Sequence, residues 1–331
     1  MFPSGASNGL IEQMVENPGV PMRAPSVAVF TVDTADRYKL NEQGLRIDSA
    51  PVNDLYINKR QSVINGYFTR IALTEFNMPW DIPNVNATNN TFSIEFLGGG
   101  VEPYDPTTVS VPEAFYTGEE LAVALETALN NKMTELGETA YYVFDVVFNT
   151  TSGKFTISNT IDTEWIIVPK NNGPRDDLLN MMGFSGFTTA NANLPYYAYE
   201  GNVASMLYTP YFDVVSKQLT KKQQVADSGT SYNTGGNLLT RIYITSNDIT
   251  TTNFETGQLG TAPFTIRREF IIPKQIYWDT KEFVNVIDLT LIDYKGNILY
   301  EAPDVIDEDQ QKFSFGTGNA NWQLTFQVSE V

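Results

Sequence analysis

The hydrophobic pattern predicts one long amphipathic helix in an otherwise strand-rich chain. Over Thr117–Lys132, apolar residues recur at the spacing of a single helical face. Thr117 and Glu120 have the spacing of a capping box, and acidic side chains in the first turn suit the helix dipole. We therefore expect a helix whose apolar stripe is buried in a core. The stripe consists of Leu121, Ala124, Leu125, Ala128 and Leu129.

The segment after this helix predicts a hairpin, a further strand and a short helix. Tyr142–Phe148 and Lys154–Ser158 flank Asn149–Gly153, whose residues favour a turn. Trp165–Val168 is a candidate third strand. Asp176–Met182 predicts a short apolar helix that Gly183 closes. Together with the long helix, these elements predict a compact α+β unit.

The rest of the chain alternates apolar and polar residues with the period of a strand. No repeat of 20–50 residues is visible, which argues against a propeller or solenoid, and no strand–helix alternation indicates a parallel α/β fold. The pattern favours a mainly β protein, an antiparallel two-sheet sandwich of the single jelly-roll type with an inserted small α+β domain. The expected strands are Ser26–Val32, Asp54–Asn58, Tyr67–Phe76, Thr91–Leu97, Ser205–Val215, Leu238–Thr245, Phe264–Ile272 continuing at Gln275–Trp278, Asn285–Asp293 forming a hairpin with Ile298–Tyr300, and Trp322–Val328.

Glycine- and proline-rich stretches suggest where these parts divide. Residues 1–25 contain four prolines and predict an extended N-terminal arm, without the basic start and apolar core of a secretory signal. The sandwich is expected from 26–100 and 187–331, and the inserted α+β domain from 101–186. Three glycines at 98–100 mark the first boundary, and the stretch after Phe184 resembles a linker.

Composition excludes several kinds of chemistry. The 331-residue chain has no cysteine and no histidine, so thiolate or imidazole zinc sites and Ser-His-Asp catalysis are excluded. We expect no enzymatic activity and no cofactor. A formal net charge of -18 disfavours nucleic-acid binding, because that binding depends on cations that neutralise phosphates. The short basic clusters Lys59-Arg60, Lys217 with Lys221-Lys222, and Arg267-Arg268 are expected in solvated faces or interface salt bridges. No apolar run is long enough for a membrane helix.

Carboxylates are the remaining candidates for metal or acid–base chemistry. The segment Asp304–Asp309 contains four of them and could bind calcium through oxygen ligands, although it lacks EF-hand spacing; the alternative is a solvated acidic loop. A sandwich glycosidase needs two facing carboxylates. The strand-borne candidates for that role are Glu95, Glu269, Asp288 and Asp293.

Two aromatic-rich stretches provide candidate interface residues, because tyrosine is enriched at binding hot spots. Packing inside the core is an equally good interpretation of the same residues. The candidates are Tyr196, Tyr197, Tyr199, Tyr208, Tyr211 and Phe212.

The central unit resembles a module of capsid and vertex proteins from icosahedral double-stranded DNA viruses. Its motifs are Val111-Pro-x-x-Phe115-Tyr-Thr-x-x-Glu120-Leu-Ala-x-x-Leu125, then Gly153-Lys-Phe-Thr-Ile-Ser158, and Leu178-Leu-Asn-Met-Met-Gly-Phe184. A later pattern, Leu291-Ile-Asp293-Tyr-x-Gly296-x-x-Leu299-Tyr300, is similar to the same proteins. The resemblance is to the penton, or minor capsid protein, of virophages and polinton-like viruses.

The resemblance implies a non-enzymatic virion protein that forms a homopentamer at the capsid vertex. Its partners would be copies of itself, neighbouring major capsid protein capsomers, and a vertex fibre or host receptor, without membrane insertion or sequence-specific nucleic-acid binding. Two other functions stay open. A viral attachment or fibre-head protein would form trimers and bind a glycan or receptor. A β-sandwich carbohydrate-active enzyme would lose its turnover when one buried strand carboxylate is replaced.

Overall fold

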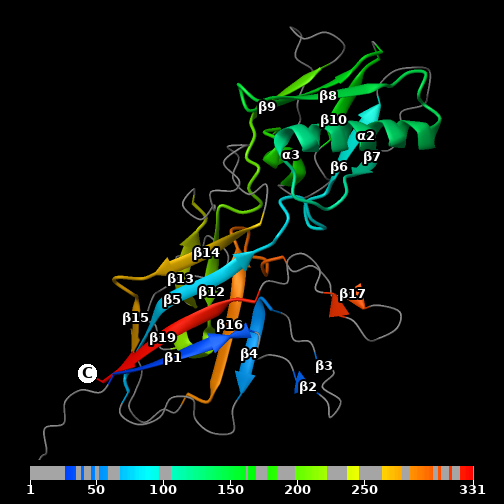
Figure 1. The fold of residues 1–331 in the computed structure, drawn as a ribbon. Helices are drawn as coiled ribbons and strands as arrows, with labels where there is room; N and C mark the ends of the chain where they lie inside the picture. The colour runs from blue at the N-terminus through cyan, green and yellow to red at the C-terminus, as the bar shows by residue number, and fades with distance from the viewer. Residues whose placement is uncertain are drawn as a thin grey trace, which may run out of the picture.

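The computed structural model contains two bodies with separate hydrophobic cores (Figure 1). One is built from two extended antiparallel sheets, and the other combines two small sheets with helices. The structure describes residues 27–34, 39–40, 46–48, 52–58, 68–96, 106–161, 163–168, 177–184, 198–221, 237–245, 263–277, 284–300, 305–306, 313–314 and 321–330. The expected N-terminal arm, Tyr196 and Tyr197 lie outside these ranges.

The first body is a sandwich of two antiparallel sheets. One sheet has the strand order β1-β19-β5-β14, with β15 also paired to β5, and the other has the order β13-β12-β16-β4. The bounds in the first sheet are β1 Val27–Asp33, β19 Gln323–Ser329, β5 Arg70–Trp80, β14 Phe264–Glu269 and β15 Gln275–Tyr277. Those in the second are β13 Leu238–Tyr243, β12 Tyr211–Val215, β16 Val286–Asp293 and β4 Asp54–Asn58.

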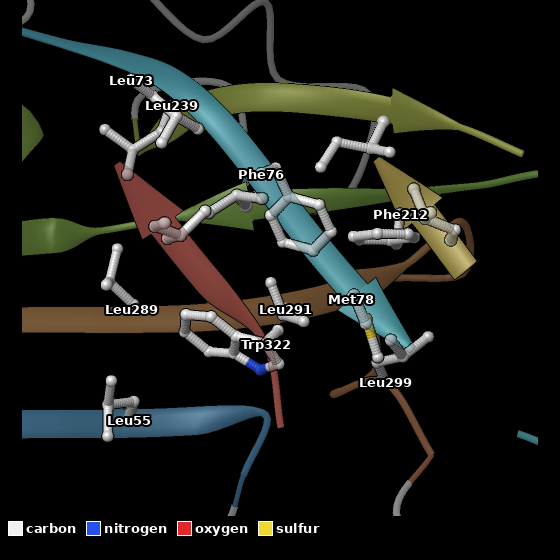
Figure 2. Packing of buried hydrophobic residues seen from close by; sticks show 14 of the residues in the cluster. Leu55, Leu73, Phe76, Met78, Phe212, Leu239, Leu289, Leu291, Leu299 and Trp322 are labelled. Carbon is white, nitrogen blue, oxygen red and sulfur yellow. The ribbon is translucent and has the colours of Figure 1, made fainter. Parts of the chain in front are cut away.

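One hydrophobic core joins the two sheets of the sandwich. Phe212 from β12 packs on Phe76 and Trp80 from β5, with ring centroids 5.5 and 5.9 Å apart. Figure 2 shows Trp322, Leu289 and Leu291 in the same layer of side chains. The apolar residues of the alternating pattern that predicted the strands are therefore the ones whose side chains enter this core layer.

A bulge in β5 explains why its sequence changes phase. Residues 71 and 73 face the core before the bulge, and residues 76, 78 and 80 face it afterwards. The register with β19 shifts between Thr325 and Phe326, so that Thr74 is the extra residue. Its hydroxyl donates to the Thr325 carbonyl at 3.0 Å. One long strand thus keeps its apolar residues inside although the spacing is irregular.

The second body is the α+β unit. Its sheets have the orders β10-β6-β7 and β11-β9-β8. All of its sheets and both of its helices contribute buried residues to the second core. The bounds are β6 Thr91–Phe96, β7 Thr107–Ser110, α2 Gly118–Leu136, β8 Phe144–Asn149, β9 Lys154–Asn159, β10 Trp165–Val168, α3 Asp177–Met181 and β11 Tyr199–Val203.

The long helix and the hairpin after it are confirmed. Thr117 is the N-cap of α2, and both hydrogen bonds of its capping box with Glu120 are present. The helix runs one turn beyond the predicted end and stops at Gly137, which has φ +77°. Its buried face is shifted: Leu121, Leu125 and Leu129 are buried with Ala122 and Met133, whereas Ala124 and Ala128 are half-buried.

Several local expectations are corrected. Only the second half of the predicted strand Ser205–Val215 forms a strand, which is β12 from Tyr211 to Val215. The stretch after Phe184, expected to be a linker, contains the strand β11 at Tyr199–Val203. The Ile298–Tyr300 strand is reduced to a single bridge between Ile292 and Ile298. The candidate strand β10 pairs with β6, which lies outside the expected 101–186 unit but belongs to its core.

Short elements complete the described chain. The helix α4 follows β12, and two small hairpins are formed by β2 with β3 and by β17 with β18. Their bounds are α4 Lys217–Thr220, β2 Lys39–Leu40, β3 Arg46–Asp48, β17 Val305–Ile306 and β18 Phe313–Ser314. The Asp304–Asp309 segment overlaps β17, and its four carboxylate residues lie outside the described residues.

A hydrogen-bonded junction connects the two bodies at one end of the sandwich. Asn84 follows β5, and its side-chain amide donates to the carbonyls of Tyr116 at 2.8 Å and Met206 at 3.0 Å. Its Oδ1 accepts from the Tyr116 N–H at 2.9 Å. The Tyr300 hydroxyl of the sandwich donates to Glu113 Oε2 at 2.7 Å. Because Asn84 is only 1% exposed, its side chain makes these three bonds in a buried site, and together with the Tyr300–Glu113 bond they restrain the orientation of the α+β unit.

Candidate interaction surfaces

Three of the six aromatic candidates, Tyr199, Tyr208 and Phe212, belong to the buried cores. Tyr199 is 1% exposed and Phe212 is 0% exposed, so neither offers side-chain surface to a partner. The Tyr199 hydroxyl donates to the Trp165 carbonyl, and burial, with a further contribution from Glu164, raises the pKa of Tyr199 to about 12. The sequence could not separate core from surface here, because both positions follow the same aromatic-rich pattern.

Tyr208 lies between the two bodies. Its side chain is 8% exposed and lines a cavity of about 190 Å³. The other walls come from Met181 in α3 and from Tyr294 and Lys295 at the turn after β16. Tyr208 therefore faces the crevice at the junction and contributes little to the outer surface.

Tyr211 is the candidate that lies in a surface cluster. It is half-buried on the outer face of β12, with Tyr243 of β13 at 5.6 Å and Tyr294 at 6.4 Å between ring centroids. The guanidinium of Arg241 stacks on its ring, with the Cζ atom 4.0 Å from the centroid. This cation–π contact fixes the ring of Tyr211. The neighbouring Tyr243 is 56% exposed and is the accessible member of the cluster.

A bidentate ion pair holds Arg241 in this position. Its Nε donates to Asp213 Oδ1 at 2.7 Å, and its Nη2 donates to Asp213 Oδ2 at 2.9 Å. Asp213 is buried although it is on the outer face, because the guanidinium covers it. The hydrogen bond to Asp213 raises the pKa of Arg241 further above its ordinary value. Sequence reasoning missed this pair, since the only signal is the register that places 213 opposite 241.

A cavity of about 680 Å³ lies farther along the outer face of the same sheet. Its walls include Asp54 and Tyr56 of β4, Thr290 of β16, and Lys217 of α4. Tyr56 is 61% exposed, which gives the cavity an aromatic rim. An aromatic rim beside polar groups is compatible with binding a polar ligand.

Two of the four candidate catalytic carboxylates, Asp288 and Asp293, have structural roles. Asp288 accepts hydrogen bonds from the Ser216 hydroxyl at 2.6 Å and from two backbone N–H groups at the start of α4. Asp293 accepts from the N–H groups of Lys295 and Asn297 and closes the turn after β16. Glu95 is on β6 in the α+β unit and Glu269 is on β14 in the sandwich. In the described part of the chain, no cluster of acidic residues could hold a metal ion.

The fold and these surfaces define a mainly β protein with antiparallel sheets, in which a two-sheet sandwich carries an α+β unit. The described residues contain no helix that is long and apolar enough to cross a membrane. The features most suited to function are surfaces: the Tyr211 cluster, the cavity beside β4, and the edges of the sheets.

Comparisons with known proteins find similarity among solved structures. No protein-family model matches the chain, and no curated protein matches it. Among solved structures, the chain is similar to the crystal structure of mavirus penton protein, at 12% sequence identity and with a TM-score of 0.47. The match covers 93% of this chain and 100% of that one. A similarity at this level carries no conclusion about function.

Proposed function

We propose that the chain is a structural capsid protein that forms the pentameric vertex of an icosahedral double-stranded DNA virus. The sandwich would be a single jelly roll, and five copies would pack side by side around the five-fold axis. The protein would be non-enzymatic and located in the virion. The basis is the penton-like motif set of residues 111–184, which includes α2, the β8–β9 hairpin and α3.

The observation that carries this proposal is where the α+β unit is attached. It joins one end of the sandwich through the Asn84 junction, and both outer sides of the sandwich remain separate from it (Figure 1). A subunit of a closed ring needs two opposite sides that meet neighbouring copies. If the two sides of the sandwich contact neighbouring copies, the α+β unit would project along the five-fold axis as a cap or a platform for a fibre.

Charge agrees with a shell role. At a net charge of -18, the protein would not condense DNA and would depend on other components for that task. The N-terminal arm would reach neighbouring capsomers of the major capsid protein or the capsid interior. The exposed end of the α+β unit would meet a fibre or host receptor.

The test is the mass of the purified chain in solution, measured by light scattering over a range of salt and protein concentrations. We expect a species near five times 36.9 kDa and five-fold symmetric particles in negative-stain images. A stable trimer, or a chain that remains monomeric at the highest concentration reached, contradicts the pentameric vertex.

The cavity beside β4 favours a second candidate, an attachment protein that binds a glycan or receptor. Tyr56 at its rim and the polar groups of Asp54, Thr290 and Lys217 are suited to a sugar, whose apolar face stacks on aromatic rings. A glycan array with the wild-type chain and a Tyr56→Ala variant separates the two candidates. Specific binding that Tyr56→Ala abolishes, together with a trimeric mass, would support attachment.

A further inference from the structure

The first sheet of the sandwich ends at β1, whose outer edge is not paired with any other described strand. Among the described strands, β1 pairs only with β19. Residues 27–32, VAVFTV, contain no charged side chain, and Val27 and Val29 are 57% and 64% exposed. Proteins usually protect such an edge with charges, proline or a covering segment, because it can pair or pack with another chain.

The opposite edge of the same sheet carries a protruding apolar pair. Ile271 and Ile272 lie between β14 and β15 and are 96% and 92% exposed. They are the two most exposed large apolar side chains in the part of the chain that the structure describes. Arg267 and Arg268 precede them on β14, and Lys274 follows. Apolar side chains with this exposure beside charged residues are typical of a protein–protein contact.

The strand registers place these two edges at matching heights. Asp33 of β1 pairs with Gln323, Gln323 with Asn77, and Asn77 with Arg267. These four residues form one row across the sheet, with the acidic Asp33 at one end and the basic Arg267 at the other. A second row runs from Val29 through Gln327 and Ala72 to Gln275. The row that contains Glu269 ends on β1 at Thr31, and the row that contains Gln275 ends at Val29. Ile271 and Ile272 lie between these two rows along the chain.

These two edges cannot meet within one molecule. The strands β19 and β5 separate them, and three strand spacings correspond to about 14 Å. In a second copy turned about an axis parallel to the strands, however, the isoleucine pair of one molecule would reach the β1 edge of the next. Arg267, which pairs with Glu75 at 3.3 Å and Glu269 at 3.1 Å in its own chain, would at the same time approach the neighbour's Asp33.

We propose that Ile271 and Ile272 of one subunit pack on Val27 and Val29 in β1 of a neighbouring copy, with Arg267 placed opposite Asp33. This contact rests on the proposed ring and identifies its two faces. It is heterologous, because it joins two different surfaces, and repeated contacts of this kind close into a ring when the rotation permits. The exposed side chains of Ile271 and Ile272 at one edge, and of Val27 and Val29 at the other, would then be buried.

The absence of cysteine from the whole chain makes a disulfide test specific. A Val29→Cys/Ile272→Cys variant of the full chain is oxidised under mild conditions and separated on a non-reducing gel. Since a disulfide requires Cα atoms less than about 7 Å apart, this pair can link only between copies. We expect a ladder of covalent species that ends at the ring, and its collapse to monomer on reduction.

The matched control is Val29→Cys/Val123→Cys. Val123 is 66% exposed on α2 in the other body, so a thiol there is accessible, although less so than at residue 272, and it lies away from the proposed contact. Equal cross-linking of both variants would mean random collision and would overturn the contact.

Replacing the apolar residues of the two surfaces by opposite charges provides an independent test. Ile271→Asp/Ile272→Asp alters only exposed side chains and is expected to weaken assembly roughly hundredfold, as the loss of two buried isoleucines implies. Adding Val27→Lys/Val29→Lys to the same chain should restore assembly at low salt. Failure of the lysines to restore it would contradict the pairing of these two surfaces.

The outcomes separate this contact from the proposed function. A pentamer that forms without the 29–272 disulfide overturns the contact and leaves the vertex proposal intact. A 29–272 ladder that closes at three copies supports the contact and overturns the pentamer. A chain that stays monomeric and does not cross-link contradicts both.

Discussion

Asn84→Ala tests whether the junction between the two bodies is as rigid as its hydrogen bonds suggest. The substitution removes three bonds, two donated to the carbonyls of Tyr116 and Met206 and one accepted from the Tyr116 N–H. Asn84 is 1% exposed, and these backbone groups would lose their side-chain partner in a buried site. At about 1 kcal/mol for each unpaired group, we expect a loss of about 3 kcal/mol in the free energy of unfolding.

The assay is urea unfolding followed by tryptophan fluorescence, with ΔG obtained by linear extrapolation. Trp165 lies in the core of the α+β unit, whereas Trp80 and Trp322 lie in the core of the sandwich. A Trp165→Phe background therefore removes the signal from the α+β unit. If the junction couples the bodies, Asn84→Ala should separate their transitions as well as lower the midpoint.

Asn130→Ala is the matched control. Its side chain makes two similar bonds, both 2.9 Å long, to the N–H and C=O of Phe144, but within the α+β unit. Asn130 is half-buried, and alanine is a better helix former, so we expect a loss of only about 1 kcal/mol with the transitions still coupled. A loss below about 1 kcal/mol for Asn84→Ala, or equal effects of both variants, would refute the reasoning.

Three further outcomes follow from individual residues. Gly183→Ala should lower the melting temperature markedly, because Gly183 has φ +89° and a Cβ there would lie 2.2 Å from the Asn202 carbonyl oxygen; Gly137→Ala, at φ +77° with open space around it, is the control and should lower it less. Thr117→Ala should reduce stability by about 1 kcal/mol in urea unfolding through loss of the α2 N-cap, while Thr127→Ala on the same helix should have little effect. Burial, with the Glu113 hydrogen bond, raises the pKa of Tyr300 to about 12, so the unfolded chain loses this proton from about pH 10 while the folded chain keeps it, and stability should fall above pH 10. Urea midpoints at pH 8 and pH 11 measure that fall, which Tyr300→Phe should reduce; an unchanged pH dependence in this variant would contradict the assignment.

The sequence by itself determined the elements whose signals are local. The capping box at Thr117 and the apolar stripe predicted α2, since both act within a few residues along one helix. Period-two alternation predicted most strands, and turn residues predicted the β8–β9 hairpin. These features depend on backbone geometry and on neighbours in the chain, so they can be read before any partner is known.

Only the tertiary structure decided which strands pair and which aromatic residues reach the surface. The pattern at Trp165–Val168 predicts a third strand without indicating its partner, and the structure pairs it with β6, about 70 residues earlier. Tyr199, Phe212 and Tyr211 share one aromatic pattern, yet the first two are core residues and only Tyr211 joins the surface cluster. Strand pairing is set by the burial of whole faces, for which a single strand carries no signal of its partner.

The candidate interaction surfaces depend on the same long-range information. The Arg241–Asp213 pair exists because the register of β12 and β13 aligns two residues 28 positions apart. The row that joins Asp33 to Arg267 crosses four strands from distant parts of the chain. The sequence supplied the charged and apolar side chains, and the sheet placed them at opposite edges and equal heights, because hydrogen-bonded strands fix the register of every residue they carry.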